Sequence, residues 1–245
     1  QIVLAKWVLR MLGYRYGVVI SYAPKITVGK AGSGMHFHMM VEKDGDNITS
    51  EDGKLSAMSR KMIAGILSSA DAITAFGNTI PTSYLRLVPH QEAPTNICWG
   101  DRNRSVVVRV PLGWTDAGDM IKDANPRQKS VAKKQKSKQT FEYRVPDGSA
   151  DVYLTLAALI VASLNGLKTS NALEIAEKLY VDVNIFKPEH KAKRETLEQL
   201  PVSCWESADA LEQKRKIFEN YGIFPAGLID NQIQKLKKFD DKGLS

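Results

Sequence analysis

The stretch from residue 140 to 167, TFEYRVPDGSADVYLTLAALIVASLNGL, constrains the fold more than any other part of the chain. Residues 140–146 alternate, so Glu142 and Arg144 share one face of an expected strand, and the side chains between and beyond them are apolar. Residues 150–167 are mostly apolar, which predicts a buried core helix. A strand with one charged face, followed directly by a core helix, favours a fold that mixes a sheet with packed helices.

Other segments carry strand or helix patterns without the regular alternation of a doubly wound sheet. We expect strands at 16–24, 35–43 and 103–111, and a short extended segment at 83–89. The segments with helical periodicity are 1–12, 54–76, 171–179, 192–199, 207–220 and 226–238. We therefore predict an α+β fold, with an antiparallel-rich sheet, flanking helices and a helical C-terminal region.

Composition excludes several classes of protein. Hydrophobic residues make up 43% of the chain and charged residues 25%, as in ordinary globular proteins. No apolar run approaches the roughly 20 residues of a membrane-spanning helix, so we expect no membrane partner. The two cysteines, Cys98 and Cys204, are too few for a disulfide framework, which predicts buried free thiols in a cytoplasmic protein.

The chain carries a net charge of +7, and much of the excess lies in residues 123–139. A run of this kind is most often a solvated surface loop, because its like charges repel one another. Nucleic-acid binding is the less favoured alternative, since no aromatic residue is interleaved with the lysines to stack on bases.

Two of the four histidines, His36 and His38, follow the small residues of the AGSG stretch at 31–34. On a strand they share one face about 7 Å apart. They could then bind a divalent metal and a phosphate oxygen in one cleft. The alternative is a pair of surface histidines, because no acidic ligand is adjacent. The glycine loop lacks a P-loop pattern, and a strand rather than a helix follows it.

Four arginines lie within or beside apolar segments, where an unpaired guanidinium is costly. They are Arg86, Arg104, Arg109 and Arg144. Several arginines around one cleft indicate a ligand with carboxylate or phosphate oxygens. The alternative is a set of structural ion pairs with Glu92, Asp101 and Glu142. Arg104 and Arg109 are five residues apart, so a regular strand would place them on opposite faces.

Five ordered motifs resemble those of glutamine synthetases, and together they cover nearly the whole chain, most strongly from 32 to 167. The motifs are GSGMHFH, SYLRLVPHQEAP, DRNRSVVVRVP, FEYRVPDGSADVYLTLAALIVASLNGL and EKLYVDV. The resemblance implies an ATP-dependent ligase that joins ammonia to the γ-carboxylate of glutamate through γ-glutamyl phosphate, with Mg²⁺ or Mn²⁺. It also implies a homo-oligomeric ring and a truncated chain: 1–245 would be the C-terminal part of the catalytic domain, without its N-terminal β-grasp domain and glutamate-rich metal strand.

The resemblance also implies a role for each matched residue. His36 and Glu142 would bind metal, whereas His38 and Arg109 would contact ATP. Gly32, Arg86 and Arg144 would bind glutamate. Arg104 would stabilise the transferring phosphoryl group, and Glu92 would lie on a flap that excludes water. With only two metal ligands, we expect the isolated chain to be inactive.

Four positions depart from the family pattern or bear on regulation. Ala31 replaces a usual asparagine, Thr140 replaces a common phosphate-binding arginine, and the loop at 112–139 is longer and more basic. Tyr180 matches a tyrosine that some bacterial members adenylylate, but its surroundings differ, so we expect no such regulation. These departures leave open a γ-glutamyl ligase with another amine, or a non-catalytic binding or assembly protein.

Overall fold

The computed structural model describes residues 1–91, 93–113, 124–125, 127 and 137–243. A four-stranded sheet has the order β1-β8-β7-β6. Its strands are β1 (Phe37–Met39), β6 (Trp99–Asp101), β7 (Val108–Val110) and β8 (Phe141–Tyr143). β8 pairs antiparallel with both β1 and β7, whereas β6 pairs parallel with β7. The prediction of an α+β fold with an antiparallel-rich sheet is confirmed.

The register of the sheet gives it one apolar face and one polar face. Trp99 is opposite Val108, which is opposite Tyr143, which in turn is opposite Phe37. In the adjacent row, Gly100, Arg109, Glu142 and His38 are paired in the same way. Because consecutive residues of a strand point to opposite faces, the first row faces the core and the second row faces away from it.

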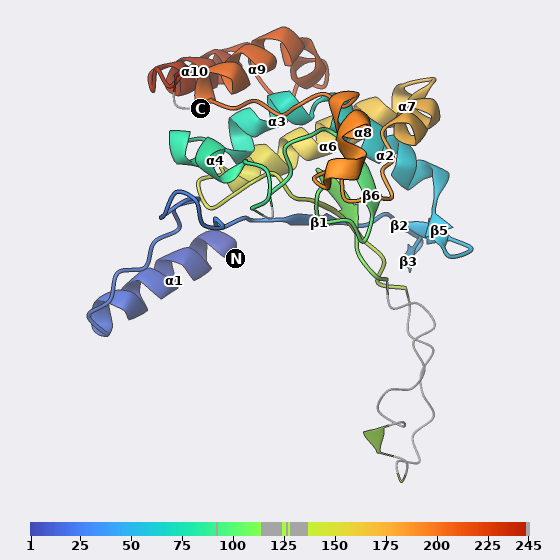
Figure 1. Ribbon diagram of the computed structural model, residues 1–245, viewed down its shortest axis with the longest axis horizontal. Coiled ribbons are helices and arrows are strands. Elements are labelled where there is room, and N and C mark those ends of the chain that lie inside the picture. Colours follow the sequence, from blue (N-terminus) through green and yellow to red (C-terminus); the bar gives the residue numbers. More distant parts are fainter. Residues whose placement is uncertain (92, 114–123, 126, 128–136, 244–245) are drawn as a thin grey trace.

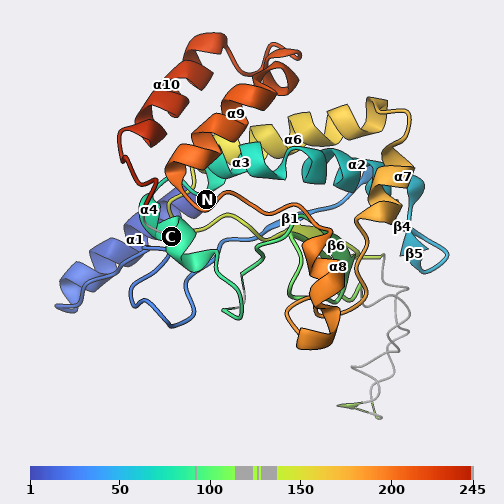
Figure 2. The ribbon, with the colours of Figure 1, turned by 45° about the horizontal axis from the view of Figure 1, so that its top comes forward.

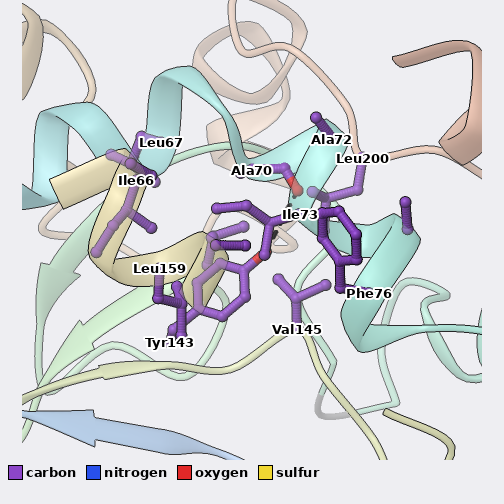
Figure 3. Packing of buried hydrophobic residues seen from close by; sticks show 14 of the residues in the cluster. Ile66, Leu67, Ala70, Ala72, Ile73, Phe76, Tyr143, Val145, Leu159 and Leu200 are labelled. Atoms are coloured by element: carbon purple, nitrogen blue, oxygen red, sulfur yellow. Dashed lines mark hydrogen bonds between the residues drawn. The ribbon is translucent and has the colours of Figure 1, made fainter. Parts of the chain in front are cut away.

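Helices cover the apolar face of the sheet in two layers (Figures 1 and 2). The first layer contains α2 (Ala57–Ser68), α3 (Ala70–Gly77) and α6 (Val152–Lys168). The second contains α9 (Cys204–Glu219) and α10 (Ala226–Lys237), which pack against α3. Figure 3 shows Tyr143 and Val145 pointing from the sheet side towards Ile73 and Leu159 of the first layer. The main hydrophobic core therefore lies between the sheet and these helices.

Smaller elements surround this centre. The hairpins β2–β3 (Glu42–Lys43, Asp46–Asn47) and β4–β5 (Ser50–Glu51, Lys54–Leu55) join β1 to α2. The remaining helices are α1 (Ile2–Arg15), α4 (Pro81–Arg86), α7 (Ala172–Lys178), α8 (Lys191–Glu195) and the 3₁₀-helix η1 (Pro188–His190). Gly13 is the sole buried residue of α1, which lies to one side of the helical layers (Figure 1).

Two predicted extended segments were wrong. Residues 16–24 form no strand, and Val18 and Val19 are exposed, because no described strand offers their backbone a hydrogen-bonded partner. Residues 83–89 are not extended either: α4 begins at Pro81, whose fixed φ suits the first turn of a helix, and includes Arg86.

The other expected elements exist with different boundaries. The helix predicted at 54–76 begins after Ser56, whose hydroxyl accepts a hydrogen bond from the Ser59 amide, and Ser69 separates α2 from α3. The strands expected at 35–43, 103–111 and 140–146 shorten to β1, β7 and β8, and β6 was missed. The predicted C-terminal helices appear as α7, α8, α9 and α10.

Both cysteines are free and buried, as predicted. Among the described helices, none alone has the length and apolar composition needed to cross a membrane. α6 and α7 pass that test as a pair, but they meet at an angle of 112°. The apolar character of α6 reflects its packing, since Ala158, Leu159 and Ala162 are in the main core.

Candidate active site

Glu142 is the centre of the polar row on the sheet. Its Oε2 atom lies 2.9 Å from Nε2 of His38, and its Oε1 atom lies 3.1 Å from Nη1 of Arg109. Nη1 of Arg144 donates a hydrogen bond of 2.7 Å to the same Oε1 atom. One carboxylate therefore joins residues of three strands, because the register places His38 and Arg109 directly opposite it, and Arg144 follows immediately after β8.

Burial differs strongly among these groups. The side chains of Glu142 and Arg144 are 3% and 4% exposed, whereas those of Arg109 and His38 are 24% and 50% exposed. A buried carboxylate with hydrogen-bonded cations is stable, but either buried charge alone would be costly. The expected structural ion pairs of Arg109 and Arg144 with Glu142 are therefore present. The open side of the cluster is formed by His38 and Arg109.

His38 is held at both ring nitrogens. Its Nδ1 atom lies 3.1 Å from the hydroxyl oxygen of Thr140, while Nε2 faces Glu142. Thr140 and Glu142 are two residues apart and therefore lie on the same face of the chain. Thr140, at the position where the family pattern has arginine, thus orients the imidazole.

His36 lies next to this cluster, two residues before His38. Desolvation, and then the positive charge of Arg144, lowers the pKa of His36 to about 4, although the negative charge of Glu142 opposes this shift. His36 is consequently neutral at pH 7, which is the form that binds a metal ion. The predicted alternation holds from 35 to 40, where the even-numbered residues, including both histidines, are exposed.

Arg86 lies beneath the small-residue loop. Nη1 and Nη2 of Arg86 donate hydrogen bonds to the carbonyl oxygens of Val145 (2.7 Å) and Arg144 (3.2 Å). A Cβ atom at Gly34 would clash with Nη2 of Arg86, and one at Gly32 would lie 2.8 Å from Cγ of Arg86. The loop therefore requires glycine at both positions, because the buried Arg86 side chain packs against it and, at Gly32, the carbonyl oxygen of Pro24 lies closer still.

Two buried charged residues near Arg86 were missed in the sequence. Lys25 donates hydrogen bonds to the carbonyl oxygen of Lys30 and to Oε1 of Gln91, and so joins the glycine loop to the segment that precedes residue 92. Asp147 accepts hydrogen bonds from Nδ2 of Asn78 and the amide of Ser149, both 2.8 Å. Desolvation lowers the pKa of Arg86, and the negative charge of Asp147 opposes this shift. Lys25 lies in no motif, and Asp147 lies within the 141–167 motif without an assigned role; the burial of both arises from contacts distant in sequence.

Arg104 occupies the exposed turn between β6 and β7, outside the strand that was predicted to contain it. Glu92 and most of the basic stretch 123–139 lie outside the described residues. Tyr180 is on the other side of β6, where its hydroxyl donates a hydrogen bond of 2.9 Å to Asp101. The structure thus brings together His36, His38, Arg86, Arg109, Glu142 and Arg144 around the polar face and the adjacent glycine loop.

The neutral imidazole of His36 and the carboxylate of Glu142 are groups of the types that bind divalent cations. They are too few for a complete site, since the described residues contain no group of three or more His, Cys, Asp or Glu side chains arranged to bind a metal. Both carboxylate oxygens of Glu142 are also engaged by cationic or imidazole groups. The described residues therefore do not form a complete metal site on their own.

Residues 1–239 match the family model described as "Glutamine synthetase, catalytic domain". The chain is 35% identical over 223 residues to a glutamine synthetase of Pyrococcus furiosus, covering 91% of this chain and 45% of that protein. It is 33% identical over 245 residues to the glutamine synthetase of Salmonella typhimurium, covering 99% and 47%. The chain thus spans about half the length of the curated relatives it matches.

Two solved structures resemble the whole of this fold. A cryo-EM structure of Plasmodium falciparum glutamine synthetase has a TM-score of 0.72 at 23% identity and covers 97% of this chain and 50% of that one. A structure of apo GmaS has a TM-score of 0.72 at 24% identity, with coverages of 99% and 49%. Both likenesses concern the fold.

Proposed function

The chain belongs to the glutamine synthetase family, and from this premise we propose that it forms part of the active site of an ATP-dependent glutamate–ammonia ligase. ATP phosphorylates the γ-carboxylate of glutamate, and ammonia then displaces phosphate to give glutamine. The single observation that carries this proposal is the polar row His38–Glu142–Arg109, with Arg144 beside it, on the open face of the sheet.

Phosphoryl transfer depends mainly on positioning and on positive charge around the transferred group. Arg109 and His38 are the partly exposed members of the cluster, so they are available to the phosphates of ATP. Arg104 stabilises the transferring phosphoryl group. Arg144, Arg86 and the backbone of Gly32 bind glutamate, and Glu92 lies on the flap that keeps water from the acyl phosphate.

His36 and Glu142 would hold a divalent cation, Mg²⁺ or Mn²⁺. The cation would neutralise charge on the phosphate oxygens during transfer. Arg109 and Arg144 already hold Oε1 of Glu142, which keeps the carboxylate in one orientation. Two ligands alone bind weakly, so a working site needs further ligands beyond the described residues. We propose that the 245-residue chain by itself is inactive.

An exposed apolar surface on α1 bears on assembly. Its exposed side chains include those of Trp7, Leu9 and Leu12. Exposed apolar patches mark interaction surfaces. We assign this surface to packing within the complete protein, a ring-forming homo-oligomer in which 1–245 is the C-terminal part of the catalytic domain. The two buried free thiols suit a cytoplasmic enzyme.

A γ-glutamyl ligase that uses another amine is the second candidate. Ala31 lacks the polar side chain usual before the glycine loop, and Thr140 binds His38 where the pattern has a phosphate-binding arginine. Both changes alter the surroundings of the substrate without removing the central cluster. A purely structural protein is less favoured, because it has no need of partly exposed cations beside a buried carboxylate.

The decisive assay measures γ-glutamyl product from glutamate and ATP with Mg²⁺ or Mn²⁺. It compares hydroxylamine, ammonia and a primary alkylamine, on both the complete gene product and the 245-residue chain. We expect the complete protein to form γ-glutamyl product with ammonia and its His36→Ala variant to form none. The 245-residue chain should form no more product than that variant. Product from the alkylamine alone would favour the second candidate, and no product from the complete protein would overturn both.

A further inference from the structure

A cavity of about 780 Å³ lies on the face of the sheet opposite to the polar row. Its wall includes Trp99 and Asp101 of β6 and Val110 of β7. These residues alternate with Gly100 and Arg109, which belong to the polar row, so they point to the other face. The volume is within the roughly 300–1,000 Å³ typical of small-molecule sites. The cavity is therefore separate from the proposed active site.

The charged side chains that line this cavity are predominantly basic. Lys54 comes from the β4–β5 hairpin, Arg60 from the first turn of α2, and Arg102 from the residue after β6. Asp101 is the single acidic residue among the described lining residues, and its carboxylate accepts the hydrogen bond of the Tyr180 hydroxyl. Among the ion pairs of the described residues, none involves Lys54, Arg60 or Arg102.

Two of these cations are held in unfavourable settings. Nε of Arg60 is buried and has no hydrogen-bond partner among the described atoms, and a cation in the first turn of a helix opposes the helix dipole. Arg102 has a φ of 54°, a left-handed conformation that is costly for a residue other than glycine. A bound anion would offset the unfavourable interaction of Arg60 with the helix dipole, because it would neutralise the charge of the guanidinium.

We propose that this cavity is a second binding site, for a small anion that carries at least two phosphate or carboxylate groups. Lys54, Arg60 and Arg102 bind the anionic groups, and the hydroxyl of Tyr180 lies at the same wall. The chemistry of arginine suits either oxyanion, because its planar donors match both carboxylate and phosphate.

The position of the cavity couples it to the polar row. Val110 lines the cavity, and the preceding residue, Arg109, contacts Glu142. Gln139 also lines the cavity, where its Nε2 atom donates to the carbonyl oxygens of Pro111 (2.9 Å) and Thr140 (2.8 Å). Thr140 in turn contacts His38. A ligand that displaces Gln139 or β7 therefore alters the surroundings of His38 and Arg109.

The test is titration of the 245-residue chain with pyrophosphate and, separately, with succinate, at constant ionic strength. Calorimetry gives the affinity, and amide NMR locates the site. We expect saturable binding of at least one probe, with shifted signals for Gly53 and Gly113. The Arg60→Gln and Arg102→Asn variants should each bind about tenfold more weakly, whereas Lys191→Gln, an exposed lysine of α8 that does not line the cavity, should bind the probe unchanged.

The two probes distinguish the source of the charge, since preference for pyrophosphate indicates a phosphorylated ligand and preference for succinate a dicarboxylate. Asparagine at position 102 tolerates the left-handed backbone, so that variant remains informative if Arg60→Gln fails to fold. The proposal is overturned if neither probe saturates, if the signals shift only around His38 and Glu142, or if both cavity variants bind like the unmodified chain. Because binding is measured without catalysis, this result is independent of the assay for ligase activity.

Discussion

His38 and Glu142 are directly opposed in the β1–β8 pair, with Nε2 of His38 2.9 Å from Oε2 of Glu142. His38 follows the glycine loop in sequence, and Glu142 lies more than 100 residues further along the chain. Thr140, the residue before β8, contacts the other ring nitrogen, so both nitrogens of the imidazole have a partner. The two residues therefore act as a unit, and a change in one alters the electrostatics of the other.

Replacing Glu142 with glutamine should lower the stability of the chain. The substitution keeps the shape but leaves the buried Arg144 without its anionic hydrogen-bond acceptor, a loss of about 1.5–3 kcal/mol. Denaturant unfolding measures the change, with the exposed Glu42→Gln as the matched control. Equal stability of the two variants would mean that Glu142 contributes nothing to the fold and is held only for function.

The ring of His36 should remain neutral well into the acid range. Its pKa is lowered to about 4 by desolvation and by Arg144, whereas the unfolded chain binds this proton near the ordinary histidine pKa of 6.5. The unfolded state therefore binds more protons between these pH values, and the free energy of unfolding should decrease as the pH falls through this window. NMR titration of the imidazole measures the pKa directly. The Arg144→Gln variant should raise it, and a titration near 6.5 in the unmodified chain would refute the assignment.

Gly65→Ala should be strongly destabilising. Gly65 in α2 lies against α6, where an added Cβ would clash with the carbonyl oxygen of Ala162 and lie 2.6 Å from the amide nitrogen of Gly166. Because both obstacles are backbone atoms, the two helices would have to separate, and we expect a loss of about 1–3 kcal/mol or more. Thermal unfolding tests this.

The matched control is Gly227→Ala in α10, where an added Cβ meets nothing within 4 Å. That change should leave stability unaltered or raise it by up to about 1 kcal/mol, since alanine favours the helix. Similar effects at both positions would argue against close contact of α2 with α6.

Phe218→Ala should also be costly. The ring of Phe218 packs 5.8 Å from that of Phe76 and 5.6 Å from that of Phe224, measured between centroids, and so joins α9 to α3. Loss of a buried aromatic ring typically lowers stability by about 3–5 kcal/mol. The same substitution at the exposed Phe239 should have little effect. Unfolding of both variants by denaturant provides the comparison, and equal losses would contradict the assigned core.

The elements with strong hydrophobic periodicity in the sequence were predicted correctly. The apolar stretch at 150–167 became α6, and the alternation around His36 and His38 survives as exposed even-numbered residues. The failures are segments whose conformation depends on partners. Residues 16–24 include β-branched side chains but have no described strand beside them, and residues 83–86 belong to α4 because Pro81 begins a helix. Propensity alone cannot supply a missing hydrogen-bonded neighbour.

The α+β class, the residue types of the polar row and the family pattern could all be predicted from the sequence, because they follow from periodicity and ordered motifs. Which charged side chains are in contact depends on the tertiary structure. The register of β1, β8 and β7 places His38, Glu142 and Arg109 in one row, and it directs Trp99, Asp101 and Val110 to the cavity behind them. The burial of Lys25, Arg86 and Asp147 was likewise decided by contacts distant in the chain. The reason is physical: a side chain's neighbours, and hence its charge state, are set by strand pairing and packing rather than by adjacent residues.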